Sequence, residues 1–292
     1  MTNPGDAGVI DRRNGARPGK ASRKATKGQP TIELPSGAAM SEVTAGCTVG
    51  RPVLSLIVPA RDEEKSLPAL LDSVAVARKQ FAGGQAQIEV IVADNRSTDS
   101  TAAIAAGCGC VVVATDATTI GGVRNAGARV ARGDVLVFVD ADTVLHPGTF
   151  IAIQAALEDF RIVAGATGVR LDRFSLGIAV TWAMMIPLVW LTGLDTGAVF
   201  CRRADFTAIG GYDETLPFAE DVRFQWTLRA LGRGRGQHLT RLRAVKAIAS
   251  TRKFDQYGDW HYFILAARAA RFVVWRRRED RALHDYWYGR RD

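Results

Sequence analysis

The chain has 292 residues, of which 47% are hydrophobic and 23% charged, so it holds enough apolar material for one large domain or two small ones. Its net charge of +8 lies at the two ends: residues 1–50 hold seven Lys and Arg against four Asp and Glu, residues 260–292 hold eight against four, and the part between holds 23 against 22. A basic excess confined to the ends excludes a basic DNA-binding core, and we expect no nucleic-acid partner.

The first 50 residues predict a disordered tail. They are rich in Gly, Pro, Ser, Thr, Ala and basic residues, and they show no hydrophobic period. They also lack the apolar core of a signal peptide, and the cysteines of the chain form no CxxC pair. We therefore expect a cytosolic protein with reduced thiols, without a disulfide framework or a zinc site.

From residue 51 onward, strand and helix patterns alternate. Short apolar runs predict buried strands over 53–58, 88–95, 110–115 and 134–142. Helical patterns lie between them, over 63–81, 97–107 and 121–133. This alternation predicts an α/β domain with a mostly parallel sheet flanked by helices.

Polar side chains follow each predicted strand. They are Arg61, Asp62 and Glu63 after the first, Asp94 and Asn95 after the second, Arg124 and Asn125 behind Gly121 and Gly122 after the third, and Asp140 and Asp142 after the fourth. In open α/β sheets, ligands bind outside the carboxyl ends of the strands. Four such ends predict a polar ligand with several hydrogen-bonding faces, and solvated loop ends on a structural sheet are the simpler alternative.

The fourth strand ends on the DXD sequence Asp140-Ala141-Asp142. Two carboxylates this close repel each other unless a cation lies between them. Mg²⁺ and Mn²⁺ prefer hard oxygen ligands and are often held by one or two carboxylates plus substrate phosphates. The pair therefore predicts a metal site, at which the ion would neutralise the charge that develops on a diphosphate leaving group.

Five stretches resemble, in their order along the chain, family 2 glycosyltransferases of the GT-A fold. They are LSLIVPARDEEKSLPALLDSV, VIVADNRSTDST, GGVRNAGARVARGDVLVFVDADT, GAVFCRRADFTAIGGYDE and FAEDVRFQWTLRALG, and the resemblance covers about residues 53–255. It implies a Rossmann-like GT-A fold and an enzyme that takes a sugar from a nucleotide-diphosphate sugar donor.

The resemblance also implies roles for single residues. On the donor side, Pro59, Arg61 and Glu63 would line the nucleoside pocket, Asp94 would face the base, Gly122 and Arg124 would lie beside the donor, and Asp140 and Asp142 would hold ribose, metal and diphosphate. The Glu220-Asp221 pair resembles the family's ED element, whose Asp acts as the general base. The GAVFCRR and IGGYDE stretches would form the floor of the acceptor side.

Asp221 has the chemistry that a base needs. An acceptor hydroxyl is a poor nucleophile, and a carboxylate within hydrogen-bond reach can take its proton as the sugar carbon is attacked. Attack opposite the leaving diphosphate would invert the anomeric centre. Because Asp221 also precedes the helical pattern VRFQWTLRALG, the alternative is an N-terminal acid favoured by the helix dipole.

The sequence departs from the family pattern at a few positions. Asp62 replaces the Asn of the family's P-x-x-N-E turn, and Arg223 stands where another acid is usual. The stretch FQWTLRALGRGRGQHLTR lacks the Q-x-x-R-W element of processive synthases, so we expect transfer of a single sugar. The stretch STRKF resembles a basic element in which Arg252 or Lys253 would touch the diphosphate, and an exposed salt bridge is the alternative.

Two apolar stretches raise the question of membrane contact. Residues 176–194 carry no charge, but a single span there would put Asp140 and Asp221 on opposite sides of a bilayer. We expect core packing or surface contact with a membrane instead. Residues 260–278 combine aromatic, aliphatic and Arg side chains, as does a helix lying in an anionic membrane interface; a terminal helix packed on the domain is the alternative.

The expected organisation has three parts. They are a disordered basic tail (1–50), a GT-A domain (51–255, with a nucleotide-sugar half at 51–145 and an acceptor half at 146–255) and a basic amphipathic helix (256–292). We expect an inverting, non-processive glycosyltransferase dependent on Mg²⁺ or Mn²⁺, peripheral at the inner face of the cell membrane, with a hydroxyl acceptor that is a lipid or lipid-linked.

Two alternatives belong to other functional classes. A nucleotidyltransferase of related fold usually carries a Gly-rich loop after the first strand, and VPARDEEKS has no Gly. A non-catalytic nucleotide-sugar binding module would not need Asp140, Asp142 and Asp221 together. The sequence does not name the sugar, the base or the acceptor.

Overall fold

The computed structural model describes residues 51–173, 194–217 and 219–250, with single positions between 174 and 193. The predicted tail (1–50), most of the apolar stretch 176–194, and the basic C-terminal segment with Arg252 lie outside the described residues. Within the described part, no helix combines the length and the apolar character that crossing a bilayer requires.

The main sheet has seven strands in the order β3-β2-β1-β4-β8-β6-β9. Their bounds are β1 Leu54–Ala60, β2 Ile88–Asp94, β3 Val111–Ala114, β4 Val135–Phe138, β6 Ile162–Ala166, β8 Val199–Arg202 and β9 His238–Arg241. The first four strands are mutually parallel, and β8 runs antiparallel to both β4 and β6. The predicted mostly parallel α/β sheet is thus confirmed.

Six helices and a small second sheet complete the described residues. The helices are α1 Leu67–Gln80, α2 Thr101–Gly107, α3 Ile120–Val130, α4 Thr149–Glu158, α6 Arg203–Ala208 and α7 Glu220–Arg233, with a short 3₁₀ turn, η1, at Gln85–Gln87. The second sheet joins β5 Thr143–Val144, β10 Ala247–Ala249 and β7 Val169–Leu171 in the order β5-β10-β7.

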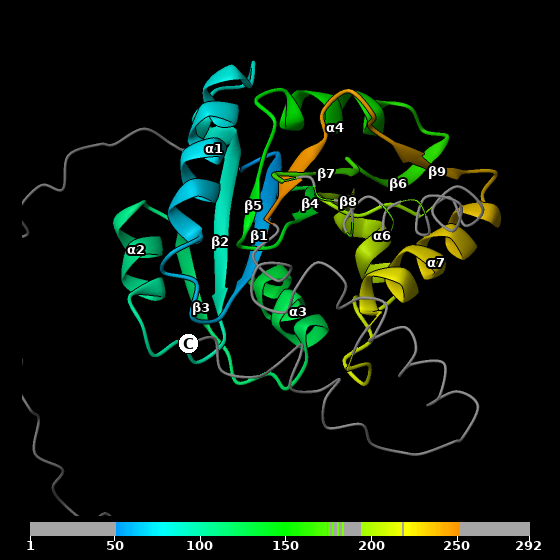
Figure 1. Cartoon of the computed structure of the whole chain (residues 1–292). Coiled ribbons are helices and arrows are strands. Elements are labelled where there is room, and N and C mark those ends of the chain that lie inside the picture. Colours follow the sequence, from blue (N-terminus) through cyan, green and yellow to red (C-terminus); the bar gives the residue numbers. More distant parts are fainter. Residues whose placement is uncertain are drawn as a thin grey trace, which may run out of the picture. The chain divides into compact units, whose positions relative to one another are not determined.

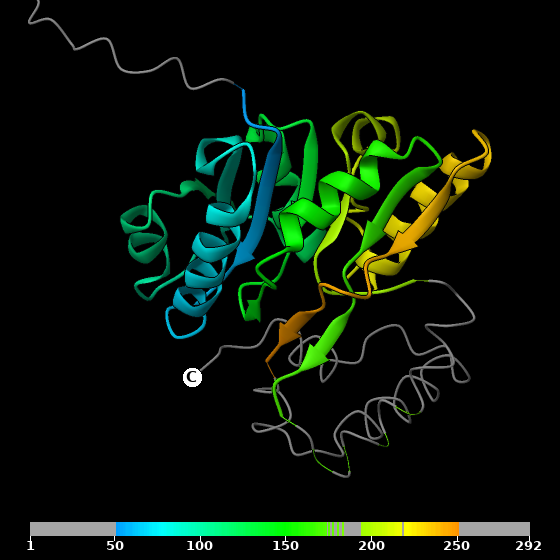
Figure 2. The same cartoon turned by 90° about the horizontal axis from the view of Figure 1, so that it is seen from above.

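Helices cover both faces of the main sheet. Leu54, Leu56 and Val58 of β1 share one apolar core with α1 and α4, whereas Ile57 points to the other face and shares a second core with α3 and α7. Figures 1 and 2 show α3 and α7 on one side of the sheet and α1 and α4 on the other. A Cβ atom on Gly127 would lie 2.6 Å from Ile57 Cγ2, so glycine at this position allows α3 to pack closely on β1.

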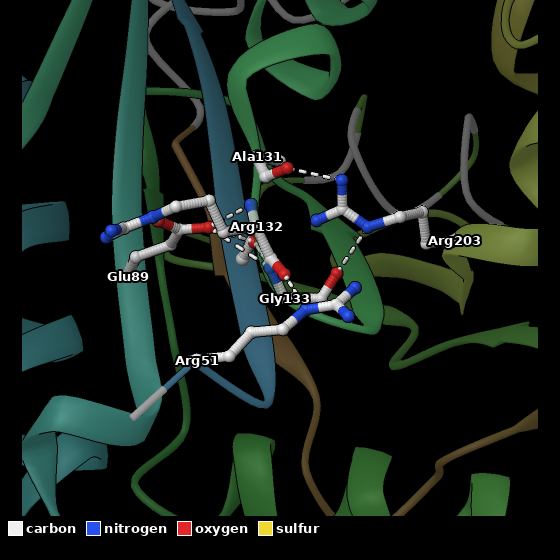
Figure 3. A network of polar contacts seen from close by, with 7 residues as sticks. Arg51, Glu89, Ala131, Arg132, Gly133 and Arg203 are labelled. Carbon is white, nitrogen blue, oxygen red and sulfur yellow. Dashed lines mark hydrogen bonds and ion pairs between the residues drawn. The ribbon is translucent and has the colours of Figure 1, made fainter. Parts of the chain in front are cut away.

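The amino ends of the central strands are held together by a polar network (Figure 3). The Glu89 carboxylate on β2 accepts from the backbone and the side chain of Arg132, and Arg51 donates to the Arg132 carbonyl over 2.8 Å. Arg203 donates to the carbonyls of Ala131 and Gly133. These groups bind one another and fix the loop before β4, so this end of the sheet has a structural role.

Candidate active site

Asp94 ends β2 beside the end of β1 and carries an unpaired acceptor. It lies opposite Ala60 in the parallel register, and its side chain is only 9% exposed. Its Oδ1 atom is buried and makes no hydrogen bond to any residue that the structure describes. A buried carboxylate oxygen without a donor is costly, so this atom marks a place where a ligand N–H can bind.

A tight turn follows β1 and explains why the first helix begins at Leu67, four residues after the predicted start. The carbonyl of Glu63 accepts from the amides of Ser66 and Leu67 at 3.0 and 2.9 Å. Asp62 has a φ of 51°, and its Oδ1 accepts from the Thr98 amide at 2.7 Å. Asn and Asp both tolerate this left-handed conformation, so Asp62 can replace the Asn of the family turn without distorting it.

The remaining predicted nucleoside-side residues lie around this turn. Pro59 is in β1, Arg61 follows that strand with 48% of its side chain exposed, and Glu63 is buried. The Glu63 amide donates to Thr101 Oγ1 at 2.8 Å, which ties the turn to the start of α2. The structure therefore brings Pro59, Arg61 and Glu63 to the same edge of the sheet as Asp94.

Arg124 of α3 forms the centre of the site. Its Nη1 atom lies 2.8 Å from both Glu220 Oε1 and Asp221 Oδ1, and its Nη2 atom lies 2.8 Å from Asp140 Oδ1. The guanidinium is 5% exposed, whereas Asp140 is 59% exposed. One buried cation thus joins an acid at the end of β4 to the two acids that begin α7, which lie about 80 residues later in the chain.

Charge and burial act in opposite directions on this cluster. Burial alone would lower the pKa of Arg124, but the carboxylates of Asp221, Asp140 and Glu220 raise it well above its ordinary value. Burial raises the pKa of Asp221 to about 6; Arg124 opposes that shift, and Glu220 and Asp140 add to it. Asp221 is therefore an ionised but readily protonated carboxylate near neutral pH, which is the state that a general base needs.

Asp221 does not cap its helix. The residue before α7, Ala219, has a φ of 60° and makes no side-chain capping bond, and the Asp221 carboxylate is directed to Arg124 instead. The helix dipole still favours an acid in the first turn. The contact with Arg124 nevertheless gives Asp221 a specific partner beyond its position at the start of a helix.

Tyr212 and Asn125 belong to the site; the sequence placed Asn125 among the polar strand-end residues and Tyr212 in the IGGYDE stretch but did not predict their contact with each other or with Arg124. The Tyr212 ring lies under the Arg124 guanidinium, with 5.2 Å between Cζ and the ring centroid. Asn125 donates to the Tyr212 carbonyl and accepts from its amide, both at 2.9 Å. In the IGGYDE stretch, two glycines precede the aromatic residue.

Gly122 has a structural reason to be glycine. The Thr119 side chain caps α3 by accepting from the Gly122 amide at 3.2 Å. A Cβ atom on Gly122 would lie 2.9 Å from the Ala117 side chain, in the loop that follows β3. Gly122 therefore permits the tight entry into α3 that positions Arg124.

The donor set at the end of β4 fits a divalent ion. Asp140 uses one carboxylate oxygen for Arg124, and most of its side chain faces solvent; Asp142 lies two residues on, where its carbonyl accepts from the Ser250 amide at 3.3 Å. Among the described residues, no group of three or more His, Cys, Asp or Glu side chains could hold a metal by itself. Two carboxylates fit an ion whose other ligands are substrate phosphates and water.

A cavity of about 250 Å³ borders Tyr212. It is lined by the 209–213 turn and by Arg223, Phe224 and Thr227 of α7. The GAVFCRR stretch forms β8 in the centre of the sheet, and most of β8 is buried. Of the two stretches expected at the acceptor side, the IGGYDE turn therefore borders a cavity. The GAVFCRR stretch lies in the core of the sheet and is absent from the cavity lining.

The sequence of the chain matches the family model described as glycosyl transferase family 2 over residues 55–185. An uncharacterized glycosyltransferase of Mycobacterium tuberculosis is 32% identical over 36% of this chain and 44% of its own length. A glycosyltransferase of PGL/p-HBAD biosynthesis from the same species is 29% identical over 56% of this chain and 64% of its own length. The matches thus span less than two thirds of these relatives.

Solved structures share the fold. The mannosyltransferase PcManGT of Pyrobaculum calidifontis, in complex with GDP-Man and Mn²⁺, aligns with a TM-score of 0.54 and 18% identity over 68% of this chain and 56% of that one. Glucosyl-3-phosphoglycerate synthase of Mycobacterium tuberculosis, in complex with Mn²⁺, UDP and glucosyl-3-phosphoglycerate, aligns with a TM-score of 0.51 and 23% identity over 77% of this chain and 84% of that one. This chain therefore shares the GT-A fold of these glycosyltransferases, and residues 55–185 resemble glycosyl transferase family 2.

Proposed function

We propose that the chain is an inverting, non-processive glycosyltransferase that moves one sugar from a nucleotide-diphosphate sugar to an acceptor hydroxyl. The observation that carries the proposal is the Arg124 cluster, because it joins a carboxylate of the donor side to the ED pair. A binding module would have no need for an ionisable Asp with a pKa of about 6 next to the place where the sugar would lie.

We assign base recognition, metal binding and proton transfer to different side chains of the site. The unpaired Asp94 oxygen would accept from a ring N–H of the base, which uracil, thymine and guanine each offer. Asp142 and Asp140 would hold Mg²⁺ or Mn²⁺, and the ion, when bound, would neutralise the charge on the diphosphate. Asp221 would take the proton of the acceptor hydroxyl while the oxygen attacks the sugar carbon and the bond to the diphosphate breaks.

The solved relatives support this donor class and the ion. One contains GDP-Man with Mn²⁺, and another contains UDP with Mn²⁺. The test is to incubate the purified chain with UDP-, GDP- and dTDP-sugars and Mn²⁺ and to measure nucleoside diphosphate release. Slow hydrolysis of one donor supports a transferase. Binding of a nucleotide-sugar without any hydrolysis supports a binding module instead.

The metal role predicts a specific defect in Asp142→Ala. The variant should bind nucleoside diphosphate more weakly than the wild type when Mg²⁺ or Mn²⁺ is present and equally well in EDTA, because the carboxylate acts through the ion. Titration calorimetry measures both conditions. Asp134→Ala is the matched control, because Asp134 pairs with Arg51 at the amino end of the sheet. Equal affinity of the wild type with and without metal would contradict the role.

We also propose peripheral contact with an anionic membrane, through residues 260–292, whose sequence combines aromatic residues with eight Lys and Arg. Each basic residue near an anionic surface contributes about 1 kcal/mol. The chain should therefore sediment with vesicles containing phosphatidylserine and should be released by high salt or by truncation after residue 259. If the sedimented fraction did not change with lipid charge, salt or truncation, this proposal and the lipid-linked acceptor that it favours would be contradicted.

A further inference from the structure

The ring of Tyr212 contacts two partners of the site, a cation and an aromatic ring. The Arg124 guanidinium lies over the ring, with Cζ 5.2 Å from the centroid, and the Phe224 ring stacks on it, with centroids 4.0 Å apart and an interplanar angle of 10°. Phe224 belongs to α7, one turn after Asp221. The ring therefore links the cation that binds the acids to the helix that carries two of them.

The backbone of Tyr212 is fixed in this place. The Asn125 side chain, next to Arg124 on α3, forms hydrogen bonds of 2.9 Å with both the carbonyl and the amide of Tyr212. Gly211 has a φ of 80°, and a Cβ atom there would lie 2.7 Å from Asn125 Oδ1. The two consecutive residues Arg124 and Asn125 thus hold the guanidinium and the tyrosine at a set distance from each other.

The hydroxyl of Tyr212 has no settled partner. It is buried and makes no hydrogen bond to a described residue, and its interaction with Asp221 lowers the pKa of that carboxyl. In the described structure, the Arg124 guanidinium donates to the Asp221 Oδ1 atom at 2.8 Å. A buried hydroxyl without a partner reduces the stability of the folded protein. The Tyr212 hydroxyl would therefore gain free energy in a conformation in which it forms a hydrogen bond.

We propose that Tyr212 is a positioning residue for sugar transfer: its ring fixes Arg124, and its hydroxyl donates to the Asp221 carboxylate as that carboxylate turns to the acceptor. The proposal rests on the proposed role of Asp221 as the base. A carboxylate that accepts from the tyrosine has one direction fixed, so that its free lone pair can be aimed at the acceptor hydroxyl. The other charged groups that face Asp221 are Arg124, Glu220 and Asp140.

The first test separates the hydroxyl from the ring. Tyr212→Phe should lower kcat about 10–100-fold, the loss expected for one hydrogen bond to a charged group, without changing donor affinity. Its melting temperature should equal or exceed that of the wild type, because an unpaired buried hydroxyl is removed. Tyr212→Leu should lower kcat further, because Arg124 then loses its support. Wild-type kcat in Tyr212→Phe would overturn the role of the hydroxyl.

Phe206→Leu is the matched control for loss of aromatic packing. The Phe206 ring lies 6.4 Å from Tyr212 and 5.9 Å from Phe224, in the same cluster. This variant should lose stability as Tyr212→Leu does and should keep kcat within about twofold. A fall of kcat in Phe206→Leu equal to that in Tyr212→Leu would overturn the positioning role of the ring, because generic packing would then explain both.

A readout without sugar transfer tests the contact directly. With ¹³C-labelled aspartate, and Asp221→Asn to assign the signal, NMR follows the titration of the Asp221 carboxyl. In Tyr212→Phe its midpoint should move upward, because the interaction with the Tyr212 hydroxyl that lowers the pKa of Asp221 is lost. An unchanged midpoint overturns the proposal whatever the acceptor. A shifted midpoint together with full turnover of Asp221→Asn would show that the base assignment, rather than the contact, is wrong.

Discussion

Asp221→Asn should lower turnover by about 10²–10⁴-fold, which is the usual contribution of a general base. The substitution keeps the shape and the polarity of the side chain but removes the proton acceptor. The donor should bind nearly as well as to the wild type, because Asp221 acts on the acceptor hydroxyl. Steady-state kinetics at saturating acceptor give the fall in kcat, and titration calorimetry gives the donor affinity.

The pH dependence of the wild type provides a second measure of the same group. Burial raises the pKa of Asp221 to about 6, so the base becomes protonated as the pH falls through that value. The kcat/KM of the wild type should therefore decline below about pH 6, and Asp221→Asn should lack this limb. Asp134→Asn is the matched control, because the Asp134 carboxylate pairs with Arg51 at the amino end of the sheet. Near-normal turnover in Asp221→Asn would make Glu220 or Asp213 the next candidate.

Arg124→Met should destabilise the fold strongly. The substitution removes the cation that lies 2.8 Å from Asp140, Glu220 and Asp221, and breaking a buried ion pair from one side costs about 3–5 kcal/mol. Because Asp140 is 59% exposed and can be hydrated again, we expect the lower end of that range. Denaturant unfolding at pH 8 measures the loss in the free energy of unfolding.

The loss should depend on pH in a defined direction. Without Arg124, the pKa of the Asp221 carboxyl rises further above its unfolded value, so the variant loses stability as the pH rises through the folded value. At pH 5 the difference from the wild type should therefore be smaller. Arg129→Met is the matched control, because Arg129 is on the same helix, 66% exposed, and 3.7 Å from Glu214. Equal, small losses in both variants would contradict a central role of Arg124.

The nucleotide half of the fold could be predicted from local patterns. The runs LSLIVPA and IEVIVAD are apolar on both faces of their strands, and this composition identifies central parallel strands without any knowledge of their neighbours. The start of α1 was predicted four residues early, because EEKS is compatible with a helix and only the hydrogen bonds to Glu63 show that it forms a turn.

The centre of the site could be predicted only in part. The sequence raised the question of which cation lies between close carboxylates, and a metal ion was the expected answer. In the structure, Arg124 already binds Asp140 and the ED pair. The contacts of Arg124 with residues about 90 positions away, and the placement of Tyr212 by Asn125, depend on the packing of α3 against α7 and on the Gly211 turn, and no local pattern encodes them.

Nucleotide-sugar binding, measured by thermal shift with Mn²⁺, tests the central claim most directly. A UDP-, GDP- or dTDP-sugar at a hundredfold excess over its Kd should stabilise the wild type by about 2.7 kcal/mol. Asp94→Ala should bind that donor about 10–100-fold more weakly, because it loses a buried charged acceptor. Asp116→Ala, whose carboxylate pairs with Arg96 on the surface, should bind like the wild type. The absence of stabilisation by every donor, with and without Mn²⁺, would contradict the account.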